Sequence, residues 1–411
     1  VCSSDLLAAF GLHEWAARVA PAIGFALAVA SPFWLLWRWT GERLARVAVL
    51  ALLAQPLMLV AGQYANLDML VAGLITLTVV LLAHAALLID AGAQGARTAL
   101  RLAWAAAALA VLAKGLIGFV LPAGIIGAWL IVSGRWRVLM RMFTTAPEAP
   151  ALFFLIAAPW FALMERIHPG FLDYFFVDQH FRRFSVGGFN NPQPVWFYPA
   201  VLVLFFLPWL VWIGRRVALW RMPGGRERDL VLLAWVWVAV VVVFFSIPRS
   251  KLLGYVLPAV PALALLAGAG LLARGEPGAG SRRLWQGVAA FGIAASFAAI
   301  VIIARHPTPS SRDLSLWMGS QLRAGDAVFM INRFDFDAGL YARLREPMRV
   351  VEHWDDEALM RSRDNWRKEL FDARRFSPDQ GARTLITPER LTATDRKSTR
   401  LNSSHANISY A

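Results

Sequence analysis

The stretch LDMLVAGLITLTVVLLAHAALLI at residues 67–89 decides the fold class of this chain. A helix of about 20 apolar residues can cross the ~30 Å hydrocarbon core of a bilayer, and a soluble domain rarely contains several uncharged runs of this length. The sequence therefore predicts an all-α polytopic membrane protein. About ten spans are expected, near residues 16–37, 44–62, 67–89, 99–113, 116–133, 149–165, 196–213, 230–247, 252–273 and 285–304. The run at 99–113 is short, so we expect its helix to be tilted or to break at Lys114-Gly115.

The composition agrees with this interpretation. The chain has 411 residues, of which 58% are hydrophobic and 17% are charged, and these values exclude a disordered protein and an ordinary cytosolic one. The formal net charge is +14, which in a soluble protein would suggest a nucleic-acid partner. Cys2 is the only cysteine, so neither an internal disulfide nor a thiolate metal cluster can be built.

The basic residues lie mostly in alternate loops. One set of loops carries 16 Lys and Arg residues, whereas the opposite set carries six. Cytoplasmic loops are enriched in Lys and Arg, so we expect the first set to face the cytoplasm. Residues 64–68, Lys114, residues 166–195 and residues 246–251 would then share the outer face. This topology accounts for most of the positive charge and removes the argument for a nucleic-acid partner.

Both ends of the chain are set apart from the fold. Residues 1–6 (VCSSDL) and 396–411 (RKSTRLNSSHANISYA) resemble translated sequencing-adapter DNA. On that interpretation we expect the chain to be a piece of a longer protein. The remaining sequence divides into a membrane domain at 7–305 and a polar, charged segment at 306–395, which follows the last span and is expected on the outer side.

The polar segment has the pattern of a small α/β domain. Strands are predicted at 327–331, 348–351 and 384–387, with helices at 337–344 and 357–371. No glycine-rich phosphate-binding loop opens either helix. We interpret the segment as an accessory domain outside the membrane, without assigning it a role.

Four ionisable residues at the predicted outer face are candidates for chemistry, because charged groups near the membrane are costly and commonly functional. Asp68 begins a span, where it could instead favour a helix N-terminus. Lys114 separates two apolar runs, where it could bind an anion or extend its ammonium to the interface. Arg249 and Lys251 lie in a short connection, in the sequence SIPRSKLLGYVLP at 246–258. Their charge opposes the usual bias, which favours an anionic ligand.

The segment FLDYFFVDQHFRRF at 171–184 holds the richest cluster. Its aromatic residues suit the membrane interface and would hold His180, Arg182 and Arg183 at the height of the lipid headgroups. A plain interfacial amphipathic helix would explain the same pattern. Two arginines beside a histidine also suit phosphate or pyrophosphate, since one guanidinium can bond two phosphate oxygens. The residues alone thus indicate an outward-facing anion site at the membrane surface.

A series of short motifs resembles one known family. The motifs are AKG at 113–115, PWF at 159–161, DQHFRRF at 178–184, PW at 208–209 and SKLLGYVLP at 250–258. In this order they resemble the bacterial aminoarabinose transferases and protein O-mannosyltransferases, which are glycosyltransferases of the GT-C fold. The resemblance implies transfer of a pentose or hexose, such as 4-amino-4-deoxy-L-arabinose, from a polyprenyl-phosphate donor. Lipid A, a glycan or a protein would be the acceptor.

The resemblance also implies roles for individual residues. Asp68 corresponds to an active-site acidic residue and is the predicted catalytic group, and His180 corresponds to a histidine that can help to hold a divalent metal ion. Lys114, Arg183 and Lys251 correspond to basic positions expected near the donor phosphate. Together with the nearby Arg182 and Arg249, they form the set predicted to bind that phosphate. The family's principal catalytic aspartate lies in a first outer loop that would precede Phe10, so we expect this fragment to lack it.

These expectations place the protein in the bacterial inner membrane, with its active site facing the periplasm. Its partners would be membrane lipids, the lipid-linked sugar and the acceptor. A lipid transporter or flippase is an alternative, but it should show paired repeats with broken helices at the midplane, and we see no such repeat. A non-catalytic polyprenyl-phosphate-binding protein also fits the fragment. An acidic residue in the first outer loop would distinguish the enzyme from it.

Overall fold

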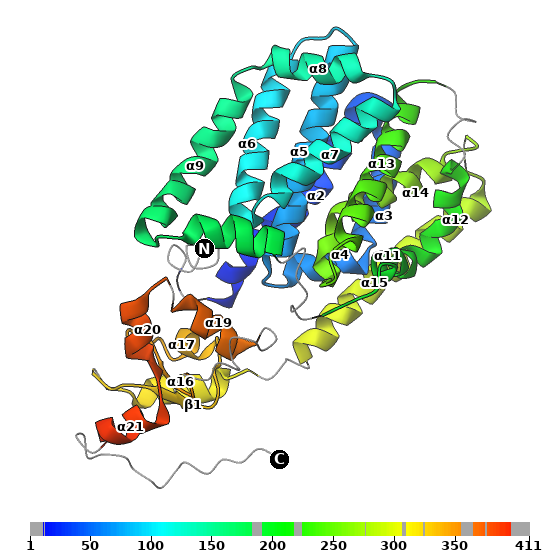
Figure 1. The fold of residues 1–411 in the computed structure, drawn as a ribbon. Coiled ribbons are helices and arrows are strands. Elements are labelled where there is room, and N and C mark those ends of the chain that lie inside the picture. Colours follow the sequence, from blue (N-terminus) through cyan, green and yellow to red (C-terminus); the bar gives the residue numbers. More distant parts are fainter. Residues whose placement is uncertain are drawn as a thin grey trace. The chain divides into compact units, whose positions relative to one another are not determined.

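The computed structural model describes residues 11, 13–182, 191–217, 224–275, 277–305, 310–323, 325–354, 365–374 and 376–395. Contacts divide the chain into two compact units. The larger unit contains the apolar helices (Figure 1), and the smaller unit contains residues 168–171 together with the described residues after 306. Each unit has its own hydrophobic core, helical in the larger unit and built on a small sheet in the smaller one.

Eight helical segments among the described residues are long and apolar enough to cross a membrane. Six are single helices: α2 (Glu14–Thr40), α5 (Leu67–Asp90), α6 (Ala96–Lys114), α9 (Ala149–Ile167), α13 (Arg226–Ser246) and α15 (Ala279–Arg305). Two are composed of shorter pieces: α11 (Phe197–Phe206), η2 (Leu207–Trp209), α12 (Leu210–Ile213) and η3 (Gly214–Arg216) form one, and η5 (Leu253–Ala259) and α14 (Val260–Leu271) form the other. The polytopic helical fold expected from the apolar runs is confirmed.

The two remaining predicted spans have other forms. At 44–62 the chain forms α3 (Glu42–Leu53) and α4 (Pro56–Gln63), which are bent by 66° relative to each other. Pro56 opens α4, and because proline has no backbone N–H it cannot continue the ladder of a preceding helix. At 116–133 the chain forms α7 (Ile117–Val132), an apolar helix of 16 residues.

The prediction that 99–113 is the short span was wrong. Helix α6 has 19 residues and begins at Ala96, because Arg97 and Arg101, which end the apolar run in the sequence, both donate to Glu148 at 2.8 and 2.6 Å. The hydrogen bond from Arg97 and those that accompany it lower the pKa of the Glu148 carboxyl to about 2. The predicted break after Lys114 is present, since Gly115 has a φ of 93° and ends the helix.

Helix α5 lies inside the bundle and packs on α2 and α6 (Figure 1). Gly24 of α2 and Gly73 of α5 face each other where these helices cross. A Cβ atom at Gly73 would overlap the backbone of Gly24, and one at Gly24 would overlap the backbone at Met69 and Leu70. Small residues allow two helix backbones to approach this closely inside a membrane. The crossing therefore fixes where the two ends of α5 lie.

One end of the bundle is closed by ion pairs. Arg226, in the first turn of α13, contacts Asp90 at the end of α5 (2.7 Å) and Asp229 of its own helix (3.5 Å). Arg135 forms a further ion pair with Asp229. Directly after Arg135, α8 (Trp136–Thr145) runs across this end of the bundle (Figure 1). These residues all come from loops predicted to face the cytoplasm, so those loops do meet at one end.

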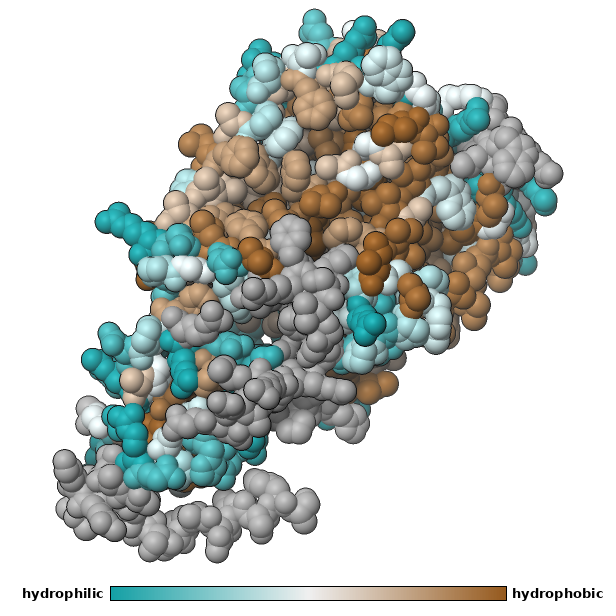
Figure 2. Space-filling model, in the orientation of Figure 1, coloured by the Kyte–Doolittle hydropathy of each residue, from teal (hydrophilic) through white to brown (hydrophobic). Residues whose placement is uncertain are grey.

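The surface of the larger unit shows the pattern of a membrane protein. In Figure 2, hydrophobic residues cover the side of the helical bundle, whereas hydrophilic residues gather at its ends. Many large apolar side chains in the spanning helices are exposed, among them Leu155 of α9 and Phe291 of α15. Such a band suits contact with lipid chains.

The smaller unit contains a parallel sheet of three short strands in the order β1-β2-β3. Its elements are α16 (Arg312–Gln321), β1 (Phe329–Ile331), α17 (Ala338–Tyr341), β2 (Arg349–Val351), α19 (Trp366–Ala373), α20 (Pro378–Thr384), β3 (Leu385–Ile386) and α21 (Pro388–Asp395). Each strand lies within its predicted range. Helix α17 is shorter than predicted, and the first part of the helix predicted at 357–371 lies outside the described residues. Helices α16, α20 and α21 were not predicted.

Asp337 joins α17 to the start of α16. Its carboxylate accepts hydrogen bonds from the hydroxyls of Ser310 (2.6 Å) and Ser311 (2.7 Å) and from the Ser311 backbone N–H (3.1 Å). Burial alone would raise the pKa of Asp337, but these hydrogen bonds outweigh it and lower the pKa below the ordinary value of 3.8. A negative charge at a helix N-terminus is also favourable, so the carboxylate stabilises α16.

We expect Asp337→Asn to destabilise the smaller unit by about 1 kcal/mol at neutral pH. A carboxyl with a lowered pKa stabilises the folded state above its unfolded pKa, and this contribution is lost as the pH falls through the folded value. The difference between parent and variant should therefore be full at about pH 6 and shrink below about pH 4. Hydrogen exchange of the α16 amides in the full chain, compared at equal pH, measures it. Asp313→Asn is the control for loss of charge alone, because Asp313 also lies in the first turn of α16 and its loss removes only the interaction with the helix N-terminus. Equal protection in parent and Asp337→Asn at neutral pH would contradict the prediction.

Candidate active site at one end of the bundle

The start of α5 positions Asp68. Asn66 precedes the helix, and its side-chain oxygen accepts a hydrogen bond from the Asp68 backbone N–H at 2.9 Å, which is the usual role of an N-cap. The capping role considered for Asp68 therefore belongs to Asn66. The Asp68 side chain is only 9% exposed, and its carboxylate contacts residues from other elements.

Lys114 is the partner of Asp68. As the last residue of α6, it forms an ion pair with the Asp68 carboxylate. Its ammonium also lies 4.6 Å from the centre of the Tyr255 ring, which belongs to η5, in the geometry of a cation–π contact. The Lys114 side chain remains 29% exposed. Three separate segments thus bring a carboxylate, an ammonium and an aromatic ring together, and the lysine side chain is partly accessible from outside the protein.

Gly254 gives Asp68 the room it occupies. A Cβ atom at this position would overlap the Asp68 carboxylate and would lie 2.8 Å from its Cγ. A side chain of any size at 254 would therefore displace Asp68 from Lys114. The glycine of the motif SKLLGYVLP is explained by this close approach, and the tyrosine that follows it by the contact with Lys114.

Lys251 has a different environment. It is 3% exposed, and its ammonium donates hydrogen bonds to the backbone carbonyls of Gln193 (2.9 Å) and Pro248. Burial lowers the pKa of this ammonium. Backbone hydrogen bonds from Lys251 to Asn191 (3.1 Å) and from Gln193 to Arg249 (3.0 Å) join the same two segments. Lys251 therefore ties residues 191–193 to the loop that leads into η5.

Of the other predicted site residues, which are His180, Arg182, Arg183 and Arg249, the structure describes the side chain of Arg249 alone. Arg249 is exposed in the loop before η5. His180 and Arg182 belong to η1 (Asp173–Arg182), a π-helical segment, but their side chains lie outside the described residues, as does Arg183 altogether. The start of η1 packs on α9, with the rings of Phe175 and Phe176 each 5.3 Å from that of Phe161. The aromatic residues of this segment thus serve packing against α9.

The residues around Asp68 do not fit a divalent metal ion. Among the residues that the structure describes, no three His, Cys, Asp or Glu side chains gather at one point, and the Asp68 carboxylate is paired with the Lys114 ammonium. Metal sites in proteins are usually built from several such ligands. The role of His180 as a metal ligand stays a prediction.

Asp68 and Lys114 were named from the sequence as separate candidates, whereas Gly254, Tyr255 and the Gln193 carbonyl were missed as parts of the site. Gly254 and Tyr255 lie in the motif SKLLGYVLP at 250–258, but the motif alone assigned no role to either residue. Asp68, Lys114 and Gln193 come from segments predicted to share the outer face, whereas Gly254 and Tyr255 lie at the start of the span predicted at 252–273. All five meet at one end of the bundle. The arrangement offers a cation for a phosphate and a carboxylate next to it.

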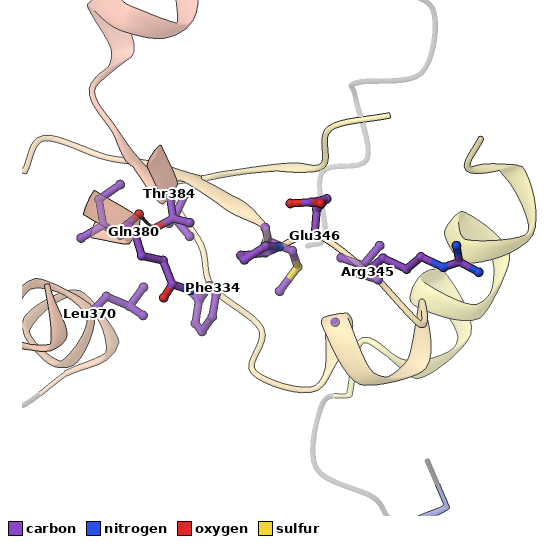
Figure 3. A pocket seen from close by; sticks show the side chains of 12 residues that line it. Phe334, Arg345, Glu346, Leu370, Gln380 and Thr384 are labelled. Carbon is purple, nitrogen blue, oxygen red and sulfur yellow. Dashed lines mark hydrogen bonds between the residues drawn. The ribbon is translucent and has the colours of Figure 1, made fainter. Parts of the chain in front are cut away.

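The smaller unit contains a hollow of about 460 Å³. Its lining includes Phe334, Leu370, Gln380 and Thr384. In Figure 3, Phe334, Leu370 and Gln380 point toward one another, whereas the side chain of Arg345 points away from them. Thr384 donates its hydroxyl to the backbone carbonyl of Gln380 at 2.8 Å. The hollow is lined mainly by apolar, amide and hydroxyl groups, so the pair of Asp68 and Lys114 is the better candidate for chemistry.

Sequence comparison relates the chain to sugar transferases. Residues 7–175 match the family model described as dolichyl-phosphate-mannose-protein mannosyltransferase. The chain is 33% identical over 302 residues to undecaprenyl phosphate-alpha-4-amino-4-deoxy-L-arabinose arabinosyl transferase 1 of Sodalis glossinidius, an alignment that covers 72% of this chain and 51% of that protein. It is 32% identical over 275 residues to the corresponding transferase 2 of Pseudomonas fluorescens, with 65% and 48% covered. The chain spans about half the length of the curated relatives it matches.

Structural comparison identifies the fold of the chain. The crystal structure of ArnT from Cupriavidus metallidurans bound to undecaprenyl phosphate matches with a TM-score of 0.74 at 24% identity, covering 95% of this chain and 79% of that chain. The structure of the same protein in the apo state matches with a TM-score of 0.73. At this identity the match establishes the fold, and the family model and the relatives add the sequence relationship. The chain is a multi-pass membrane protein with the GT-C fold of ArnT, and it is related in sequence to the aminoarabinose transferases over about half of their length.

Proposed function

We propose that the chain is part of a membrane glycosyltransferase that moves a sugar from a polyprenyl-phosphate donor to lipid A or another acceptor. The observation that carries the proposal is the cluster of Asp68, Lys114 and Tyr255, which three separate segments form at one end of a GT-C bundle. The relatives named above are transferases of 4-amino-4-deoxy-L-arabinose from undecaprenyl phosphate. That aminopentose is the sugar we propose first, with another pentose or a hexose as alternatives.

The proposed location is the bacterial inner membrane, with the Asp68 end facing the periplasm. The distribution of charge supports this orientation, because 16 basic residues fall in the loops of the opposite end and six in the loops of the Asp68 end. The Asp68 end is also where a donor phosphate would meet an acceptor outside the cytoplasm. Lipid A, a glycan and a protein are the acceptor classes.

In this proposal the Lys114 ammonium binds the donor phosphate. Lysine has three N–H donors, and the exposed part of Lys114 leaves room for an anion beside Asp68. During transfer the bond between the anomeric carbon and the phosphate oxygen breaks, and the polyprenyl phosphate leaves with the electron pair. A nearby cation stabilises the charge that develops on this leaving group. Arg182, Arg183 and Arg249 are proposed as further contacts to the same phosphate.

Asp68 is proposed to act on the acceptor. The acceptor oxygen forms a bond to the anomeric carbon from the face opposite the phosphate, so one displacement inverts that carbon. If the acceptor is a hydroxyl, its proton passes to the Asp68 carboxylate, which acts as general base. If the acceptor is a phosphate, Asp68 orients the groups around it. Lys251 would position the 191–193 segment with two of its N–H groups and retain a third for the donor.

Binding and transfer can be tested with the chain in phosphatidylcholine nanodiscs. We expect undecaprenyl phosphate to bind, and Lys114→Ala to weaken binding about tenfold or more, because a charge-assisted hydrogen bond is lost. Arg283→Ala, at the start of α15, is a matched control that should bind like the parent. Transfer is measured with the full-length protein, which includes the first outer loop, using the aminoarabinose donor and lipid A, as a mass gain of one aminopentose. Binding without transfer would favour a lipid-phosphate-binding protein, and absence of both would overturn the proposal.

A further inference from the structure

A crevice lies between membrane helices on the side of the bundle where α8 runs, away from the Asp68 cluster. Its volume is about 130 Å³. The residues that line it come from α5, α6, α7 and α8, and they include Thr78, Trp104, Phe119, Ala123, Gly127 and Phe143. Nothing in the proposed sugar transfer uses this space, since Asp68 and Lys114 lie at the opposite ends of α5 and α6.

The lining of the crevice is apolar throughout. Thr78 has the only side-chain hydroxyl in it, and that hydroxyl is already bonded to the Leu74 carbonyl at 2.8 Å. The rings of Trp104 and Phe119 form one wall, with centres 5.5 Å apart. Apolar cavities of about 150 Å³ stay dry and accept apolar molecules. An unfilled crevice would also forfeit the dispersion contacts of its walls, so a hydrocarbon chain is the occupant that its chemistry favours.

Helix α8 is built to lie in the plane of the membrane surface beside this crevice. Its Val138 and Met142 are buried against the bundle, whereas Trp136, Met140 and Phe143 are 57%, 49% and 57% exposed. An exposed apolar stripe of this kind lies in the interface between headgroups and acyl chains. Phe143 belongs both to the exposed stripe and to the lining of the crevice. The crevice therefore opens at the level of the lipid headgroups.

Arg137 and Arg141 lie one helical turn apart on α8, on the exposed face that is turned away from the crevice lining. Both side chains are exposed. Neither forms an ion pair with an acidic side chain within the part of the chain that the structure describes, in contrast to Arg135, which is paired with Asp229. Basic side chains on an interfacial helix attract anionic lipid headgroups. The α8 end thus combines an apolar crevice with two basic side chains on the helix that borders it, which are the features that bind an acyl chain and an anionic headgroup.

We propose that this crevice is a binding site for an anionic phospholipid of the leaflet at the α8 end. One acyl chain enters between α6 and α7 against Trp104 and Phe119, and the phosphate lies against Arg137 and Arg141. The lipid fills a gap between the helices that carry Asp68 and Lys114 at their far ends. The site takes a structural lipid, distinct in position and in leaflet from the lipid-linked sugar proposed as substrate.

Gly127 allows the crevice to be filled without disturbing the fold. A Cβ atom at Gly127 would have no atom within 4 Å, so Gly127→Leu projects a side chain into the space that the acyl chain would use. Gly287 of α15 has equally open surroundings, which makes Gly287→Leu a matched control with the same change in helix propensity. Ala123→Leu, which blocks the same crevice from another position, is a second variant.

The test uses phosphatidylglycerol that carries a photoreactive diazirine in one acyl chain, at low content in phosphatidylcholine vesicles that contain the purified chain. We expect illumination to label α6 and α7 near Trp104 and Phe119. Gly127→Leu should reduce this label about tenfold, equivalent to the loss of about two buried methylene groups, and Gly287→Leu should leave it unchanged. Equal labelling of Gly127→Leu and the parent would overturn the proposal.

A second arm tests the headgroup. Arg137→Gln with Arg141→Gln should lower labelling by phosphatidylglycerol at least about fivefold, while labelling by phosphatidylcholine with the same diazirine chain changes little. An equal fall for both lipids would overturn the assignment of an anionic headgroup. Displacement of the label by undecaprenyl phosphate, but not by unlabelled phosphatidylglycerol, would overturn the assignment of the lipid and give the crevice to the donor.

Discussion

Asp68→Asn is expected to reduce sugar transfer by about 10²- to 10⁴-fold, the range that a general base contributes. Asparagine has nearly the size of aspartate, so it fits the space left by Gly254. It cannot accept a proton from an acceptor hydroxyl, and it no longer neutralises the Lys114 ammonium. The donor phosphate should then bind at least as tightly as in the parent, because Lys114 loses a competing anion. The expected signature is a large fall in kcat with little change, or a decrease, in the KM for the donor.

Asp90→Asn provides the matched control. Asp90 lies at the other end of the same helix and also pairs with arginine, namely Arg226 at 2.7 Å. Asp90→Asn also removes a carboxylate from an ion pair, but Asp90 is remote from the site and more exposed than Asp68 (33% against 9%). Transfer by the full-length protein is measured as lipid A modified per unit time at saturating donor. If Asp68→Asn and Asp90→Asn reduced kcat equally, Asp68 would be a structural ion-pair partner and the catalytic assignment would be wrong.

Gly73→Val is expected to have the largest effect on stability. The added carbons would overlap the backbone of Gly24 in α2, and a backbone cannot move aside as the end of a flexible side chain can. Overpacking of a core costs about 1–3 kcal/mol and sometimes more, and a clash with backbone belongs at the upper limit. We expect the midpoint of thermal unfolding to fall by about 5 °C or more, with a smaller fall for Gly73→Ala.

The measurement for Gly73 is thermal unfolding of the purified chain in detergent, followed by tryptophan fluorescence. Gly287→Val is the control, because a side chain at Gly287 meets no atom within 4 Å. A midpoint for Gly73→Val equal to that of Gly287→Val would mean that α2 and α5 can separate at the crossing without cost. Reduced sugar transfer with an unchanged midpoint would instead assign Gly73 a role at the site.

The apolar runs were sufficient to predict the membrane fold, because each spanning helix must bury its backbone polar groups within itself and needs a continuous apolar surface. They failed where a charge is satisfied by tertiary contact. Arg97 and Arg101 end a run in the sequence, yet α6 includes both, since Glu148 neutralises them at the end of the bundle. Helix α8 was missed for a related reason: it lies across the bundle, so its apolar residues never form a run of bilayer length.

The candidate site was predictable as a set of charges but not as an arrangement. Asp68 and Lys114 are 46 positions apart, and their ion pair depends on where α5 and α6 end. The sequence also could not distinguish Lys114, which is partly exposed, from Lys251, which is buried. The partners of Lys251 are backbone carbonyls, and every residue has a carbonyl, so no residue type signals them.

The two ends of the bundle differ in what holds them, and this has a consequence for the conditions under which the protein is handled. Asp90, Arg135, Arg226 and Asp229 hold the α8 end through charges that retain some exposure to solvent, and dissolved salt screens such pairs over a distance of about 10 Å at 0.1 M. The contact of Gly24 with Gly73 involves no charge and is insensitive to ions. Ionic strength therefore weakens these ion pairs, and the partly exposed pair of Lys114 with Asp68, but spares the crossing that sets the position of α5.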